Sequence, residues 1–142
     1  MSGVAEQNPV LLVEDDLSDI LLTRRALKRG KLPISLHTTQ TGEDALAFLR
    51  REGVHADAPR PRLIILDLNL RGLSGHEVLQ AIKSDAALCA IPVVVFTTSH
   101  ADADVAAVYA ARANGYVSKP IGLSRVIQDI VHYFVNVSVA PV

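Results

Sequence analysis

Acidic side chains, a lysine and a threonine follow short apolar runs in this 142-residue chain. Glu14 and Asp15 come after one run, Asp67 after a second, and Thr97 and Lys119 after two more. Carboxylates that pack together repel one another unless a cation joins them, and oxygen ligands of this kind suit Mg²⁺. A carboxylate can also be a nucleophile toward phosphorus, with a metal and a lysine offsetting the charge on the phosphoryl group. This combination is what the formation of an acyl phosphate needs.

These residues can act together only if the apolar runs lie side by side. Short apolar runs alternate with helical patterns, which predicts βα units, a parallel sheet and helices on both of its faces. Ligands of such an open, doubly wound α/β sheet bind at the carboxyl ends of its strands, where the polar residues fall. The predicted strands span residues 10–13, 34–38, 63–66, 93–96 and 116–117. The predicted helices span 18–29, a segment capped by Thr41, 74–84, 102–113 and 123–135.

The composition indicates one globular domain that does not bind nucleic acid. The 14 basic and 15 acidic residues nearly cancel, and 49% of the residues are hydrophobic. Cys89 is the only cysteine, so a monomer can form no disulfide, which suits a reducing compartment. We find no apolar run of transmembrane length and no signal peptide, and predict a cytoplasmic protein without a membrane partner. We expect an N-terminal arm over 1–9, a domain over 10–135 and a tail over 136–142.

Four segments at the predicted strand ends resemble the signature segments of CheY-like response regulator receivers. They are Val-Glu-Asp-Asp at 13–16, Leu-Asp-Leu-Asn at 66–69, Phe-Thr-Thr-Ser at 96–99 and Tyr-Val-Ser-Lys-Pro at 116–120. Their order and spacing agree with the family, and the resemblance runs from about residue 10 to residue 135. It implies a flavodoxin-like three-layer sandwich with strand order 2-1-3-4-5, and a receiver in a two-component phosphorelay.

The resemblance also implies a phosphoacceptor and a metal site. Asp67 would accept a phosphoryl group from a sensor histidine kinase. Mg²⁺ would lie beside it, bound by Asp67, directly by Asp15, through water by Glu14, and by the backbone carbonyl of Asn69.

Other residues receive switching roles by the same resemblance. Thr97 and Lys119 would contact the phosphoryl group, and the rotamer of Tyr116 would follow Thr97. The Lys119–Pro120 peptide bond would be cis, as in the family. The switched face would comprise the fourth helix, the fifth strand and the fifth helix, and would signal in trans. The chain is thus expected to be a signalling switch that assists its own phosphotransfer and dephosphorylation, and not an enzyme.

The segment 67–75 is similar, in addition, to regulators that partner phytochrome-type histidine kinases. That similarity implies a bacterial phytochrome as the kinase and a homodimer formed through the face of the fourth and fifth helices. One position departs from the family, because Arg71 stands where proline is usual. Proline would stiffen the loop after the nucleophile, so we expect Arg71 to leave this loop freer.

Three other functions remain open. An unphosphorylated pseudo-receiver would use the same fold only as an interaction module. A phosphatase of the haloacid dehalogenase type also uses an aspartate nucleophile, but it needs an acid two residues later, where this chain has Asn69. A flavodoxin-like flavin binder would place a phosphate after the first strand, where Glu14, Asp15 and Asp16 would repel it.

Several residues have a plainer interpretation. Asp16 is expected to be a solvated or capping acid, and Thr98 and Ser99 could cap the fourth helix as well as contact phosphate. Tyr116 could be an ordinary core residue with a solvated hydroxyl. A basic group on the first helix is expected to be a solvated face, with an acidic partner surface as the alternative. This group consists of Arg24, Arg25, Lys28 and Arg29.

Overall fold

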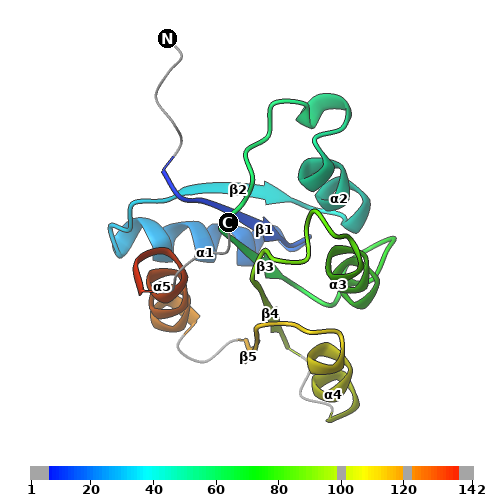
Figure 1. Cartoon of the computed structure of the whole chain (residues 1–142). Coiled ribbons are helices and arrows are strands. Elements are labelled where there is room, and N and C mark those ends of the chain that lie inside the picture. The colour runs from blue at the N-terminus through cyan, green and yellow to red at the C-terminus, as the bar shows by residue number, and fades with distance from the viewer. Residues whose placement is uncertain (1–6, 99–101, 120–122, 138–142) are drawn as a thin grey trace.

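The protein is a five-stranded parallel sheet with helices on both faces (Figure 1). The computed structural model describes residues 7–98, 102–119 and 123–137. The strand order is β2-β1-β3-β4-β5, which confirms the predicted doubly wound sheet. The strands are β1 (Pro9–Val13), β2 (Ser35–Thr39), β3 (Leu63–Leu66), β4 (Val93–Thr97) and β5 (Gly115–Ser118).

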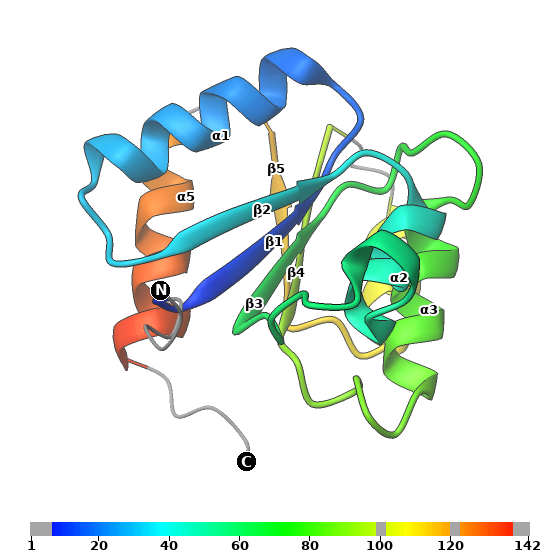
Figure 2. The ribbon, with the colours of Figure 1, turned by 90° about the horizontal axis from the view of Figure 1, so that it is seen from above.

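The helices form two outer layers. Helices α1 and α5 cover one face of the sheet, and α2, α3 and α4 cover the other (Figure 2). Their bounds are α1 (Leu17–Arg29), α2 (Gly42–Arg50), α3 (Gly75–Ser84), α4 (Asp102–Ala110) and α5 (Leu123–His132). A 3₁₀ turn (Gly53–His55) follows α2, and a π-helical segment (Tyr133–Val137) continues α5.

Each central strand supplies side chains to both layers of the core. In β1, Leu11 and Val13 pack on the side of α2 and α3, whereas Val10 and Leu12 pack on the side of α1 and α5. Successive strand residues point to opposite faces, so a strand buried on both sides is apolar throughout. That is why the short apolar runs of the sequence predicted the strands.

Side-chain caps fix where the helices near the carboxyl edge of the sheet begin. The Asp16 carboxylate accepts hydrogen bonds from the backbone N–H groups of Ser18 and Asp19 at the start of α1. Thr41 caps α2 as predicted, and Ser74 forms a capping box with Glu77 at the start of α3. These caps hold the first turns of three helices close to the strand ends.

Two helix ends differ from the predicted ones. Helix α4 ends at Ala110 and not at Ala113, because Arg112 adopts a left-handed conformation with φ of 68°. The backbone N–H of Asn114 then donates to Val93 O at 2.7 Å, which joins the chain to the sheet. The last helical segment extends to Val137 in π-helical form, past the predicted start of the irregular tail at residue 136.

Some predictions fall on residues that the structure leaves undescribed. Ser99 and the predicted cis bond before Pro120 lie outside the described residues, as do residues 1–6 of the arm and 138–142 of the tail. Within the described ranges, the helices are too short or too polar to cross a membrane.

Candidate functional site

The parallel register brings the predicted acidic residues to one edge of the sheet. Val13 of β1 pairs with Leu66 of β3, so the residues that follow them emerge side by side. The backbone N–H of Asp67 donates to Val13 O at 3.0 Å, which extends this pairing by one residue. Glu14 and Asp67 therefore lie next to each other, as the positions of these acids at strand ends predicted.

Three carboxylates form a compact cluster at this edge. Glu14, Asp15 and Asp67 each offer one oxygen, and these oxygens all lie within 4.8 Å of one another. Glu14 and Asp67 are buried, and Asp15 is half-buried. Such a set of hard oxygen donors fits a small divalent cation, which also relieves the repulsion among the carboxylates.

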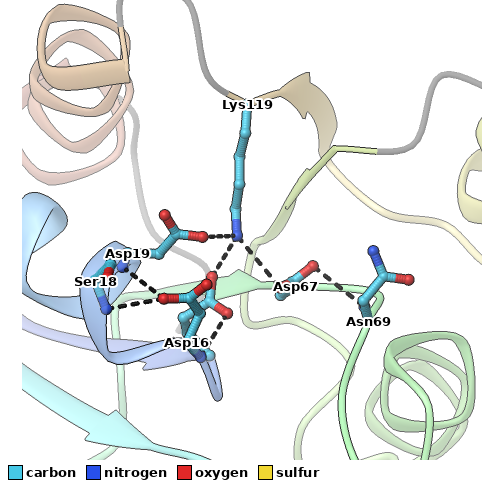
Figure 3. Close-up of polar contacts among 7 residues, drawn as sticks. Asp16, Ser18, Asp19, Asp67, Asn69 and Lys119 are labelled. Carbon is cyan, nitrogen blue, oxygen red and sulfur yellow. Dashed lines mark hydrogen bonds and ion pairs between the residues drawn. The ribbon is translucent and has the colours of Figure 1, made fainter.

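Lys119 enters the cluster from the end of β5 (Figure 3). Its ammonium group donates to Glu14 Oε1, to Asp19 Oδ2 at 2.8 Å and to Asp67 Oδ2 at 3.2 Å. A lysine has three donors, so each of them has a carboxylate partner here. The predicted proximity of Lys119 to Asp67 and Glu14 is confirmed by these contacts.

Asp19 is the member of this network that the sequence analysis missed. It lies in the first turn of α1, three residues after the Asp16 cap, on the side that faces Lys119 (Figure 3). The one sequence signal for Asp19 was its place in the first turn of a capped helix that begins at the carboxyl edge of the sheet. The direction of its side chain depends on how α1 is rotated against the sheet, and the sequence pattern does not define that rotation closely enough.

The electrostatics of the site follow from burial and from this pairing. Burial raises the pKa of Glu14 to about 7, the neighbouring Asp67 carboxyl adds to the rise, and the Lys119 ammonium opposes it. Burial alone would lower the pKa of Lys119, but hydrogen bonds to Asp19 and Glu14 and the charge of Asp67 outweigh it. The pKa of Lys119 therefore lies above its ordinary value, and the lysine remains charged at neutral pH.

A close backbone approach holds the loop after β3 in place. The N–H of Gly75 donates to Leu68 O at 2.9 Å, and a Cβ atom at Gly75 would lie only 2.3 Å from Asp67 O. Glycine is therefore required where α3 begins. The backbone N–H of Asn69 donates to Asp67 Oδ1 at 3.1 Å, which leaves Oδ2 of Asp67 directed toward Lys119.

Arg71, the departure from the family, lies beside the cluster. Its Nε is 3.6 Å from Asp15 Oδ2, and its side chain is 81% exposed. In the same loop, the N–H of Leu73 donates weakly to Glu43 Oε1 at 3.4 Å. The contact of Arg71 with a candidate metal ligand was not foreseen, and the expected freedom of this loop stays a prediction.

The remaining predicted residues occupy the surroundings of the cluster. Thr97 is fully buried at the end of β4, and its main-chain carbonyl accepts from the N–H of Lys119 at 2.9 Å. Tyr116 is partly buried in β5 against the core on the side of α2 and α3. Asp16 caps α1 as predicted and has no place in the carboxylate cluster of the described residues. Contacts of Thr97, Thr98 or Lys119 with a phosphoryl group stay predictions, as does a rotamer of Tyr116 that follows Thr97.

Comparisons with known proteins agree with this geometry. The family model of the response regulator receiver domain matches residues 10–131. Response regulator Rcp1 of Synechocystis sp. is 39% identical over 142 aligned residues, which cover 96% of this chain and 97% of Rcp1. The phosphorylated cyanobacterial phytochrome response regulator RcpA superposes with a TM-score of 0.90 at 38% identity, covering 96% of this chain and 99% of RcpA. The Mn²⁺-bound form of Rcp1 superposes with a TM-score of 0.88 at 38% identity, covering 95% of this chain and 99% of the Rcp1 chain.

Proposed function

Because this chain belongs to the response regulator receiver family and is a response regulator of the two-component type, we propose that Asp67 accepts a phosphoryl group from a histidine kinase. One observation carries the proposal: the buried Asp67 carboxylate lies both in a cluster of three carboxylates and beside the ammonium of Lys119. A nucleophilic oxygen, a set of metal ligands and a fixed positive charge thereby meet at one point.

The residues that would hold the metal are those of the cluster. We propose that Asp15 and Asp67 bind Mg²⁺ directly, with Glu14 acting through water and Asn69 through its backbone carbonyl. When bound, Mg²⁺ supplies positive charge opposite the oxygens of the phosphoryl group. The fit of three hard oxygen donors within 4.8 Å supports a divalent cation at this cluster, and the existence of an Mn²⁺-bound form of the relative Rcp1 agrees with a divalent cation as the ligand.

The chain's own groups account for the transfer. An oxygen of Asp67 attacks phosphorus of the phosphohistidine, a P–O bond forms as the P–N bond breaks, and the imidazole nitrogen keeps the electron pair. Lys119 lies 3.2 Å from Asp67 Oδ2, close enough for its ammonium to pair with a phosphoryl oxygen. The Thr97 hydroxyl would donate to another phosphoryl oxygen from the end of β4.

The signal would leave the site through neighbouring elements. Movement of Thr97 toward the phosphoryl group would open space for Tyr116, and so bias two packings of the face formed by α4, β5 and α5. This proposal is supported by the positions of Thr97 and Tyr116 on adjacent, paired strands, where Tyr116 is the register partner of Val95.

The kinase partner that we propose is of the phytochrome type. The support is the similarity to RcpA, which is described as a cyanobacterial phytochrome response regulator. We also propose a homodimer that pairs through α4 and α5. Helix α4 carries exposed apolar side chains, among them Tyr109 with 52% of its surface exposed. The expected cytoplasmic location and the absence of enzymatic and nucleic-acid-binding functions stay predictions.

The decisive experiment is phosphorylation by acetyl phosphate, followed by intact mass spectrometry. We expect wild type to gain one phosphoryl mass with Mg²⁺ and none in EDTA, and we expect Asp67→Asn to gain none. Asp129→Asn, which changes an exposed acid of α5, is the matched control and should label like wild type. Labelling of Asp67→Asn would exclude Asp67 as the acceptor. A wild type that stays unlabelled, under conditions that label a proven receiver, would favour the pseudo-receiver.

A further inference from the structure

The three carboxylate partners of Lys119 are not equivalent. Glu14 and Asp67 belong to the cluster that fits a divalent cation, whereas Asp19 is not among the clustered ligands. A cation bound at the cluster would draw on the negative charge of Glu14 and Asp67 and would repel the Lys119 ammonium. Asp19 is then the carboxylate partner of Lys119 that the cation leaves unshared.

The geometry of Asp19 suits this task. Its Oδ2 lies 2.8 Å from Lys119 Nζ, closer than Asp67 Oδ2 at 3.2 Å. Its side chain is 26% exposed, and its backbone N–H donates to the Asp16 cap at 3.3 Å. Helix α1 thus holds this carboxylate on the side of Lys119 away from Asp67 (Figure 3).

We propose that Asp19 is a positioning residue that holds the Lys119 ammonium on the α1 side of the cluster, so that Glu14, Asp15 and Asp67 remain available to the divalent cation. The inference rests on the proposed function, because it concerns the same metal site. Without Asp19, the Lys119 ammonium pairs only with Glu14 and Asp67, and it competes with the cation for these two carboxylates. Asp19 therefore strengthens metal binding although it is not a ligand.

The test is Mn²⁺ affinity, measured from the electron paramagnetic resonance signal of the free ion. We expect Asp19→Asn to weaken Mn²⁺ binding by roughly tenfold, which corresponds to about 1.4 kcal/mol. Asp19→Glu keeps the carboxylate and should recover most of the affinity. Asp16→Asn is the matched control: it removes one negative charge from the same helix start, and asparagine caps a helix as well as aspartate does. We expect it to change the affinity less than twofold.

A double-mutant cycle separates positioning from a general loss of negative charge. If Asp19 acts through Lys119, Asp19→Asn will cause no further loss of affinity in a Lys119→Met background. The inference is overturned if the tenfold loss persists there, if Asp16→Asn causes an equal loss, or if Asp19→Asn binds Mn²⁺ like wild type. A wild type that binds no Mn²⁺ overturns the metal site of the proposed function, and this inference with it. Circular dichroism of each variant confirms that an affinity change does not come from unfolding.

Discussion

Two lysines are equally buried at opposite ends of the sheet, and they differ in what surrounds them. Lys119 and Lys83 are each 7% exposed. Lys119 lies at the carboxyl end of β5 among three carboxylates. Lys83, at the end of α3, donates to the main-chain carbonyls of Cys89 and Ile91 and to the side-chain oxygen of Asn114, which precede β4 and β5.

The difference in partners gives the two lysines opposite electrostatics. Burial lowers the pKa of Lys83, because its acceptors are neutral and do not offset the loss of water. The pKa of Lys119 is raised, because hydrogen bonds to carboxylates outweigh the same loss. The acceptors of Lys83 are fixed parts of the fold, whereas two of the carboxylates around Lys119 belong to the cluster that we propose to bind a divalent cation. In this protein, the buried lysine at the candidate site is thus the one whose partners are carboxylates, and the buried lysine at the other end of the sheet has neutral partners.

The same substitution at both lysines gives the largest expected contrast. Lys119→Met removes a positive charge from beside the transferring group, so we expect acetyl phosphate to label Asp67 about 100-fold more slowly. Lys83→Met leaves buried carbonyl oxygens without a donor, so we expect a loss of about 2 kcal/mol in the free energy of unfolding. Its labelling rate should stay within about twofold of wild type, because no ligand of the site is touched. Labelling is followed by intact mass and stability by urea unfolding.

The contrast between the two lysines fails if Lys83→Met slows labelling or if Lys119→Met does not. Slow labelling of a folded Lys83→Met protein would show that the amino end of the sheet is coupled to the site. Full labelling of Lys119→Met would remove the lysine from the chemistry and leave it a structural role.

The acidic end should also have a pH dependence of its own. The pKa of Glu14 is raised from 4.5 to about 7 in the folded protein, so between these values the folded state binds more protons than the unfolded state. In EDTA, the contribution of Glu14 to stability is complete below pH 4.5 and is lost as the pH rises through 7. The slope is at most about 1.4 kcal/mol per pH unit for one proton. The Glu14→Gln variant should lack this slope of the free energy of unfolding against pH. Urea unfolding of wild type and variant from pH 4.5 to 8 measures the two slopes. Equal slopes would place the raised pKa elsewhere.

Much of the acidic end was readable from the sequence, and the reason is topological. In a parallel sheet, residues that follow buried strands meet at one edge, so Glu14, Asp15, Asp67 and Lys119 could be placed together without knowing any side-chain conformation. The apolar runs also identified the three central strands β1, β3 and β4, because burial on both faces favours apolar residues along them, up to Thr97 at the end of β4.

Other features depend on details that the pattern of residue types does not carry. Asp19 reaches Lys119 across a separation of 100 residues only because α1 is rotated to face it. Lys83 is a polar residue at a helix end, a position that is ordinarily solvated, and its burial depends on the turn before β4 folding over it. Helix α4 ends early because Arg112 adopts a left-handed conformation, which a non-glycine residue rarely does.

Arg71 offers the smallest test of the comparison, because it is a cation at the same acidic end but on the surface. Its Nε lies 3.6 Å from Asp15 Oδ2, and with 81% of its side chain exposed the ion pair is weak. We expect a divalent cation to compete with Arg71 for the charge of Asp15, so Arg71→Gln should strengthen Mn²⁺ binding by about threefold at low salt. The gain should disappear at about 0.5 M salt, where exposed charges are screened.

Arg125→Gln, which breaks the exposed pair with Asp129 on α5, is the matched control and should leave the affinity unchanged. If Arg71→Gln weakens Mn²⁺ binding, the arginine supports the loop and does not compete with the cation. The buried Lys119 is held by Asp19, and loss of Asp19 is expected to weaken metal binding roughly tenfold. A threefold gain on loss of the exposed Arg71 would show that the effect of a basic side chain on metal binding depends on its burial and on its carboxylate partner.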